Sequence, residues 1–206
     1  MITLHHLNQS RSKRIIWLLE ELGVDYQVVP YQRDAVTFLA PPELKAVHPL
    51  GKSPVIEIDG RVIAESGAIT EYLIEHFAPE RLAPARDSAE YIDYLQWLHF
   101  AESSGILPLL LKLFLAKDGA KTQFLEGYAN SEAAKVLGYV NAQLEGKRYL
   151  VADKLTGADI MMSFIAEGVH ASGMLEHFPH IKTYWAGLAA LPGYQKANHT
   201  EASLSV

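Results

Sequence analysis

The stretch His48–Gly67, HPLGKSPVIEIDGRVIAESG, determines the fold that we predict for the N-terminal part of the chain. Residues 56–59 alternate apolar and acidic side chains, which is the period of a half-buried strand. Asp59-Gly60 is a strong signal for a two-residue hairpin turn, and a second short apolar run follows it. Pro54 precedes the first strand and Glu65-Ser66 opens a helix. The hairpin therefore brings a proline turn and a helix start into one neighbourhood.

This neighbourhood is suited to holding a peptide. The bond before Pro54 is of the kind that can be locked in the cis form. We expect an exposed backbone at Val55, to which an extended peptide can add like a strand. The helix start at Ser66 favours an anionic group. The stretch thus predicts a peptide-binding surface.

Size and composition restrict the class of protein. The chain has 206 residues, 49% of them hydrophobic, which is enough for one large or two modest domains. A net charge of -6 argues against nucleic-acid binding, and the absence of cysteine excludes a disulfide scaffold and a cysteine nucleophile. The N-terminus lacks the pattern of a secretory signal, and the most apolar segment, 105–116, is too short to span a bilayer. We expect a cytoplasmic protein that does not bind membranes.

The remaining patterns predict the order βαβ-α-ββα followed by helices alone. Residues 2–7 and 26–29 are strand candidates, and between them lies a helix that Ser10 or Ser12 can cap and Gly23 ends. From residue 88 onward no strand pattern appears, and the clearest local signal is a capping box in which Thr156 and Asp159 satisfy each other's backbone groups. Because prolines and mixed charges follow residue 79, we predict an N-terminal domain at 1–79, a linker at 80–87 and an all-helical domain at 88–206.

Four segments resemble the cytosolic glutathione transferases, in particular a serine-type branch of fungi and bacteria. They are NQSRSKRIIWLLEELG at Asn8–Gly23, YQRDAVTFLAPPELKAVHPLGKSPV at Tyr31–Val55, AESGAI at Ala64–Ile69 and LTGADIMMSF at Leu155–Phe164. The resemblance implies an α/β thioredoxin-like N-terminal domain, an all-α C-terminal domain and a homodimer. It also implies that glutathione is the co-substrate, without a further cofactor, and binds mostly to the first domain. A small hydrophobic electrophile would bind mostly to the second.

The chemistry of such an enzyme requires a thiolate. A free thiol has a pKa of about 8.5, and lowering it by about 2 units needs about 2.7 kcal/mol of extra stabilisation of the anion. One hydrogen bond to a charged group supplies about 1.5–3 kcal/mol, so one hydroxyl at a helix start is nearly sufficient. Because serine-type enzymes of the family place their hydroxyl there, the resemblance implies that Ser10 is catalytic, with Ser12 as the second choice. The alternative use of Ser10 is a plain helix cap.

The resemblance also implies a set of glutathione-binding residues within the opening stretch. They are Lys52, Ser53, Pro54, Val55, Glu65 and Ser66.

Each of these residues has an ordinary alternative use. Glu65 can pair with the α-amine of glutathione and Ser66 can bind its α-carboxylate, or the two can be a helix cap beside a solvated acid. A cis Pro54 would turn the N–H and C=O of Val55 towards the cysteinyl part, whereas a plain strand-start proline is trans. Lys52 can bind the glycine carboxylate or remain solvated.

Two other groups of residues, arginines and histidines, give less specific predictions. Arg11 and Arg14 oppose the dipole of the first helix, which favours a dimer contact or an internal salt bridge over substrate binding. Neither His5-His6, whose side chains point to opposite faces of a strand, nor His177 with His180, which a proline separates, predicts a metal site.

The sequence favours an enzyme that conjugates reduced glutathione to hydrophobic electrophiles. Reduction of organic hydroperoxides could use the same thiolate. A non-catalytic module that only binds glutathione is the third possibility, and the presence of the serine and binding residues argues against it. No motif encodes the acceptor substrate.

Overall fold

The computed structural model describes residues 1–119 and 121–204, which fall into two compact units. The first unit contains Met1–Ala83 and the chain from Leu188 onward, and the second contains Pro84–Gly187. The structure thus groups the C-terminal helix with the N-terminal unit, whereas the sequence analysis assigned it to the helical domain. The physical reason is that this helix packs along the first helix of the N-terminal unit.

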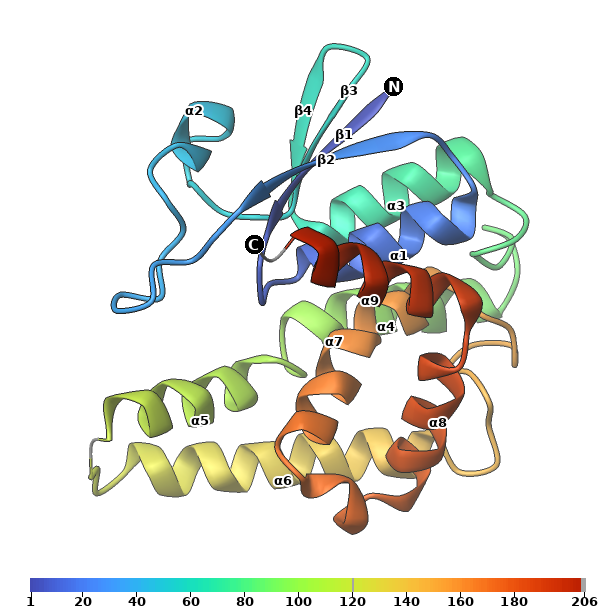
Figure 1. Cartoon of the computed structure of the whole chain (residues 1–206). Helices are drawn as coiled ribbons and strands as arrows, with labels where there is room; N and C mark the ends of the chain where they lie inside the picture. Colours follow the sequence, from blue (N-terminus) through green and yellow to red (C-terminus); the bar gives the residue numbers. More distant parts are fainter. Residues whose placement is uncertain (120, 205–206) are drawn as a thin grey trace. The chain divides into compact units, whose positions relative to one another are not determined.

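A four-stranded sheet forms the centre of the first unit (Figure 1). Its strands are β1 (Ile2–Leu7), β2 (Tyr26–Tyr31), β3 (Val55–Ile58) and β4 (Arg61–Ala64). The order across the sheet is β2-β1-β3-β4, with β1 parallel to β2 and β3 antiparallel to both of its neighbours. This mixed sheet with its helices confirms the predicted βαβ-α-ββα order and the thioredoxin-like fold.

The predicted hairpin is present between β3 and β4. Asp59 and Gly60 both have positive φ, +50° and +75°, as a two-residue turn of the hairpin type requires. In β3 the side chains of Ile56 and Ile58 are buried and that of Glu57 is exposed, which confirms the alternation seen in the sequence.

Four helices complete the first unit. They are α1 (Ser12–Leu22), α2 (Leu44–Val47), α3 (Ser66–Phe77) and α9 (Pro192–Leu204). The five consecutive residues Ile15–Leu19 are all buried, because α1 contacts β1, α3 and α9. Gly23, at φ +67°, ends α1 in the left-handed conformation that glycine adopts without steric cost. The first turn of α1 is therefore fixed on several sides by well-packed elements.

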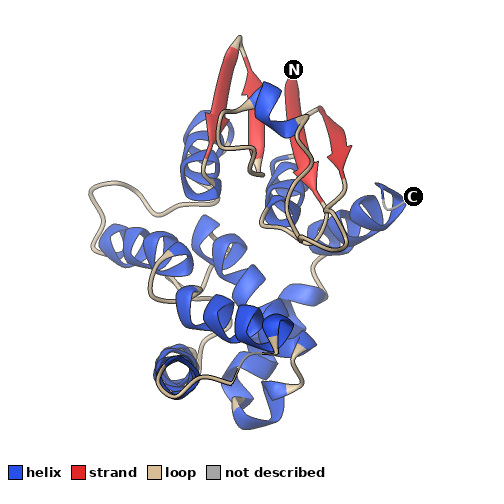
Figure 2. Ribbon diagram, turned by 90° about the vertical axis from the view of Figure 1, so that its left-hand side faces the viewer, coloured by secondary structure: helices blue, strands red, loops and turns tan. Residues whose placement is uncertain are grey.

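The described part of the second unit is built from helices and loops (Figure 2). The helices are α4 (Glu90–Glu102), α5 (Leu107–Asp118), α6 (Leu125–Gln143), α7 (Gly157–Ala171), the 3-10 helix η1 (Met174–His177) and most of α8 (Pro179–Ala189). Helix α4 packs on α7, and α5 packs on α6. This arrangement confirms the all-helical character predicted for the second half.

By length and composition alone, one stretch of the described residues, Glu90–Asp118, is long and apolar enough to cross a membrane. This is weak evidence, because core helices of proteins that never enter a membrane pass the same test. In the structure the stretch forms two helices, α4 with 13 residues and α5 with 12, separated by the turn at 103–106. A membrane-spanning helix needs about 20 residues.

The start of α7 contains the predicted capping box. Asp159 Oδ2 accepts hydrogen bonds from the backbone N–H of Thr156 (2.9 Å) and from its hydroxyl (3.2 Å). The Oδ1 atom accepts from the N–H of Leu150 (2.9 Å) and from the hydroxyl of Tyr184 (3.0 Å). Burial of the carboxyl group raises the pKa of Asp159 to about 6, against the opposing effect of these four bonds.

Candidate active site

The two candidate serines lie between the end of β1 and the first turn of α1. The helix begins at Ser12, and the residue in the capping position is Arg11, whose side chain makes no capping bond. Neither serine is therefore the residue directly before the helix, but Ser10 still binds its first N–H group, in keeping with one of the two expected caps. Ser10 Oγ accepts a hydrogen bond from the backbone N–H of Ser12 (3.2 Å) and lies 2.8 Å from Ser12 Oγ.

The hydroxyl of Ser12 is held on every side by this unit. It donates to the carbonyl oxygen of Leu7 (3.1 Å) and accepts from the N–H of the same residue (3.3 Å). It also lies 2.8 Å from Nδ1 of His6. Ser12 is 0% exposed and Ser10 is 5% exposed, so Ser10 is at the outer end of the pair. Of the two, Ser10 has the hydroxyl with fewer internal partners.

His6 is the buried end of this group of polar side chains. Burial lowers its pKa to about 4, so the ring is neutral at pH 7. Its Nε2 atom lies 3.6 Å from a carboxylate oxygen of Glu201 on α9, and the other oxygen of Glu201 lies 3.6 Å from Nζ of Lys13. His5 points to the opposite face, where its ring nitrogens lie 3.0 Å from the Tyr31 hydroxyl and 2.8 Å from a Glu57 oxygen.

The loop before β3 is joined to the same strand end. The Ser53–Pro54 bond is cis, as the resemblance implied. The Ser53 hydroxyl donates to the carbonyl oxygen of His5 (2.7 Å) and accepts from the N–H of Leu7 (3.1 Å). The side chain of Ser53 therefore fixes the loop to β1 and is already occupied by these two bonds.

The backbone at Val55 differs from the expectation. The sequence analysis predicted that it is exposed, but Val55 is 1% exposed and lies between His5 of β1 and Ala64 of β4. The reason is the strand order, which puts β3 inside the sheet. The part of this loop that remains at the surface is two to three residues earlier, where Ser53 is half-buried and Lys52 is exposed.

The start of α3 provides the second half of the site. Helix α3 begins at Ser66, as predicted, and the preceding Glu65 is exposed with a φ of +69°. A positive φ is strained for a residue with a Cβ, and such strain clusters at functional sites. The buried Ser66 hydroxyl accepts a hydrogen bond from Nη2 of Arg14 (3.0 Å).

Arg14 has a role that the sequence analysis did not foresee. Its side chain is 2% exposed and turned inward to Ser66, which argues against a dimer contact, the first of the two uses expected for it, and agrees with the internal position that the second, a salt bridge, requires. By this contact it connects the first turn of α1 to the start of α3. The only sequence signal was an arginine where the helix dipole disfavours one.

The structure thus brings most of the predicted residues together around the first turn of α1. A continuous set of hydrogen bonds joins Ser10, Ser12, the Leu7 N–H and Ser53, and a separate bond links Arg14, in the first turn of α1, to Ser66. The sequence analysis missed His6 and Glu201 in this region. Their contact joins residues 195 positions apart, 6 and 201, and no local pattern predicts it.

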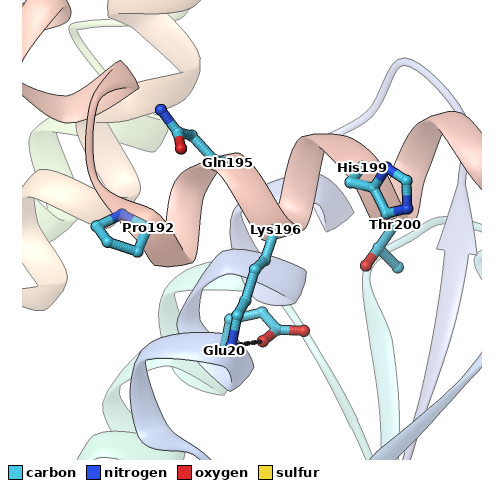
Figure 3. A pocket seen from close by; sticks show the side chains of 6 residues that line it. All are labelled: Glu20, Pro192, Gln195, Lys196, His199 and Thr200. Atoms are coloured by element: carbon cyan, nitrogen blue, oxygen red, sulfur yellow. Dashed lines mark ion pairs between the residues drawn. The ribbon is translucent and has the colours of Figure 1, made fainter.

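A separate surface pocket lies between α1 and α9 in the same unit (Figure 3). It is lined by Glu20, Pro192, Gln195, Lys196, His199 and Thr200. Lys196 points to Glu20, with Nζ 3.6 Å from a carboxylate oxygen. None of the predicted site residues lines this pocket, so it is distinct from the candidate site.

The described side chains do not form a metal site. Within 1–119 and 121–204 no group of three or more histidine, aspartate or glutamate side chains is arranged to hold a metal ion.

Comparison with known proteins gives matches along most of the chain. A model of the glutathione S-transferase N-terminal domain matches residues 1–75, and a model of the C-terminal domain matches residues 106–192. Glutathione S-transferase 1 of Saccharomyces cerevisiae is 35% identical over 187 residues, covering 80% of this chain and 79% of the yeast protein. Glutathione S-transferase 3 of Schizosaccharomyces pombe is 34% identical, covering 80% of this chain and 72% of that protein.

Solved structures show the same architecture. A glutathione S-transferase from Actinobacillus pleuropneumoniae has a TM-score of 0.88 and 37% identity, covering 98% of this chain and 93% of the other. A Lodderomyces elongisporus homologue, solved with two GSH per subunit, shares the fold with a TM-score of 0.83 at 22% identity, covering 97% of this chain and 98% of the other. The chain therefore belongs to the glutathione S-transferase family, whose enzymes use glutathione as co-substrate.

Proposed function

We propose that this glutathione transferase conjugates reduced glutathione to small hydrophobic electrophiles and that Ser10 stabilises the thiolate. The observation that carries the proposal is the position of the Ser10 hydroxyl. It lies at the start of a well-packed helix, and it is the outer member of a pair whose inner member is already bound by Leu7 and His6. A hydrogen bond to a thiolate is worth about 1.5–3 kcal/mol, which corresponds to about one to two pKa units.

The remaining contacts of glutathione follow from the two loop ends beside Ser10. Glu65 is exposed and can pair with the α-amine, and the buried Ser66, oriented by Arg14, can bind the α-carboxylate at the start of α3. The backbone at Ser53, just before the cis Pro54, would lie along the cysteinyl part, while Val55 continues into the interior of the sheet. The exposed Lys52 would bind the glycine carboxylate. As implied by the family, we expect a cytoplasmic homodimer, and the linker at 80–87 stays a prediction from the sequence.

The test of this mechanism is the variant Ser10→Ala. We expect kcat/KM for conjugation to an aryl halide to fall by about 10- to 100-fold, because each 1.4 kcal/mol is a factor of about ten. The pKa of the bound thiol, followed by the ultraviolet absorbance of the thiolate, should rise towards its free value of about 8.5. An unchanged rate and an unchanged thiol pKa in the variant would remove Ser10 from the mechanism.

A ligand without a thiol proton is the matched control. S-methylglutathione has the same peptide but cannot ionise at sulfur, so Ser10→Ala should leave its Kd nearly unchanged. A large loss of affinity for this ligand would show that Ser10 acts in general binding. An assay with an organic hydroperoxide measures the rival peroxidase activity, and binding without any turnover would favour a non-catalytic module.

A further inference from the structure

His6 ends a chain of three side chains that runs from the candidate catalytic hydroxyl into the interior of the first unit. Ser10 Oγ lies 2.8 Å from Ser12 Oγ, and Ser12 Oγ lies 2.8 Å from Nδ1 of His6. Both contacts are hydrogen bonds of good length. All three side chains are at most 5% exposed, so the protein alone, and not bulk water, determines the directions of these bonds.

The single proton of the Ser12 hydroxyl has several acceptors around it. The carbonyl oxygen of Leu7 lies at 3.1 Å, and Ser10 Oγ and His6 Nδ1 each lie at 2.8 Å. A hydroxyl has one proton and two lone pairs. If Nδ1 of His6 carried no proton, the Leu7 carbonyl and Nδ1 would compete for the Ser12 proton, and one buried acceptor would lose its bond. Leaving a buried polar group unsatisfied is costly.

The other tautomer of His6 takes Nδ1 out of this competition. With a proton on Nδ1, the ring donates to one lone pair of Ser12 Oγ, and the N–H of Leu7, which Ser12 shares with Ser53 Oγ, faces the other. The Ser12 proton is then shared between the Leu7 carbonyl and Ser10 Oγ, and the contact between the two serines is a bond that Ser12 donates. Because both lone pairs of Ser12 are in use, the Ser10 hydroxyl does not donate inward to Ser12. Its proton is left for a group at the surface of the site.

The surroundings of His6 keep it neutral over the range of an activity assay. Burial lowers its pKa to about 4. The charged groups that face it are Glu201 of α9, 3.6 Å from Nε2, and Lys13 of α1, which is 3.6 Å from the other oxygen of Glu201. The ammonium group of Lys13 offsets the charge of Glu201, and this reduces the preference for a proton on Nε2.

We propose that His6 is a positioning residue that donates from Nδ1 to Ser12 and thereby directs the Ser10 hydroxyl proton to the sulfur of bound glutathione. The proposal rests on the function proposed above, because it requires Ser10 to be the hydroxyl that meets the sulfur. His6 itself does not touch the substrate and takes no proton from it.

The test compares His6→Leu, which removes the donor, with His6→Asn, whose side-chain amide can place an N–H near the position of Nδ1. The readout is the pKa of the thiol in bound glutathione. We expect His6→Leu to raise this pKa by about one unit, a tenfold loss of thiolate at a pH below the pKa. We expect His6→Asn to restore most of the wild-type value. The Kd of S-methylglutathione should stay the same in both variants, which a merely structural role would not predict.

A double variant separates this role from a general effect on folding. In a Ser10→Ala background, His6→Leu should change the thiol pKa no further, because His6 acts only through Ser10. His5→Asn is the matched control, since His5 is a buried histidine on the same strand with its ring on the opposite face, and it should leave the thiol pKa unchanged. If His6→Leu does not fold, His6→Gln, whose amide reaches the position of Nε2 instead, replaces it.

Two results would overturn the proposal. One is a thiol pKa in folded His6→Leu or His6→Gln that equals the wild-type value, while Ser10→Ala raises it. This result would exclude the role of His6 and leave the proposed function of Ser10 intact. The other is a nitrogen-15 spectrum that shows the proton of neutral His6 on Nε2. If Ser10→Ala itself has no effect on the thiol pKa, the serine mechanism fails and the positioning role of His6 fails with it.

Discussion

The starts of α1 and α7 each combine hydroxyl side chains with one buried titratable residue, but they are satisfied in different ways. At α7 the carboxylate of Asp159 accepts four hydrogen bonds, all from residues of its own unit, and Thr156 completes a capping box. At α1 the residue before the helix, Arg11, makes no capping bond, and the chain from His6 ends at Ser10, the outer member of the serine pair. The α7 cluster is closed, whereas the α1 cluster is open at one end.

This difference indicates which cluster serves stability and which serves binding. A closed and fully bonded polar cluster rigidifies a core, because every buried group is satisfied. An open cluster keeps a donor available for a ligand while its inner members hold it in one orientation. The pKa shifts also differ, since burial raises the pKa of Asp159 to about 6 and lowers that of His6 to about 4. The predictions below test whether the two clusters separate in this way.

The largest effect on stability is expected for Asp159→Ala. The variant leaves buried donors of Leu150, Thr156 and Tyr184 without their acceptor. Each unsatisfied buried group costs about 1–3 kcal/mol, so the free energy of unfolding should fall by about 4 kcal/mol. Chemical denaturation measures it.

The nearby Asp153 provides a matched control. It is exposed and accepts a hydrogen bond from the N–H of Arg148 (3.1 Å), so Asp153→Ala should cost less than about 1 kcal/mol. Equal losses of unfolding free energy in the two variants would contradict the claim that the closed cluster stabilises the fold more than an exposed hydrogen bond does.

The second prediction concerns pH, to which the two clusters should respond with opposite sign. The folded pKa of Asp159 is raised, so its contribution to stability is present below about pH 4 and is lost as the pH rises through about 6. The folded pKa of His6 is lowered, so its contribution is present above about pH 6.5 and is lost as the pH falls through about 4. Each shift corresponds to about 3 kcal/mol at 1.4 kcal/mol per unit.

Difference curves between wild type and single variants isolate these two contributions. Between pH 4 and 7, the advantage of wild type over Asp159→Asn should shrink as the pH rises, and its advantage over His6→Asn should grow. Other titrating groups cancel in each difference. Two curves that slope in the same direction would contradict the opposite signs.

The short-range part of the fold could be predicted from the sequence. The alternation at residues 56–59, the turn at Asp59-Gly60 and the capping box of Thr156 and Asp159 each involve residues only a few positions apart. Their chemistry is local, so the pattern and the structure agree. The predicted helix start at Ser66 is of the same kind.

The parts that could not be predicted depend on the order of strands and on long-range packing. Val55 was expected to have an exposed backbone, but whether a strand lies at the edge of a sheet or inside it is a property of topology. Glu201 reaches His6 only because α9 packs along α1, after the chain has passed through the other unit. Arg14 gave a sequence signal, but its partner Ser66 is 52 residues away.

The third prediction compares one hydroxyl from each cluster directly. Thr156 Oγ1 accepts from the N–H of Ala158 and belongs to the closed cluster, so Thr156→Ala should lower the free energy of unfolding by about 1 kcal/mol. Ser10→Ala should lower it by less, about 0.5 kcal/mol, and reduce activity instead. Urea denaturation gives the free energy of unfolding of each variant, and a conjugation assay gives the activity of each. A Thr156→Ala protein that loses activity but not stability would contradict the assignment of the α7 cluster to stability.

The smallest effect is expected at Glu65, where the open site carries backbone strain. Its φ of +69° suits glycine, so Glu65→Gly should relieve backbone strain. Glycine also raises the entropy of the unfolded chain, which offsets part of this gain, so the net stabilisation should be about 0.5 kcal/mol. The same change removes the carboxylate proposed to pair with the α-amine of glutathione, so the Kd for glutathione should rise. Glu65→Ala is the control, because it removes the carboxylate but keeps the Cβ and therefore the strain. We expect the two variants to weaken glutathione binding equally and only the glycine variant to have a higher unfolding midpoint. The loss of affinity would then come from the carboxylate, and the gain in stability from the relief of backbone strain. A glycine variant that is less stable than the alanine variant would show that this conformation is not a source of strain.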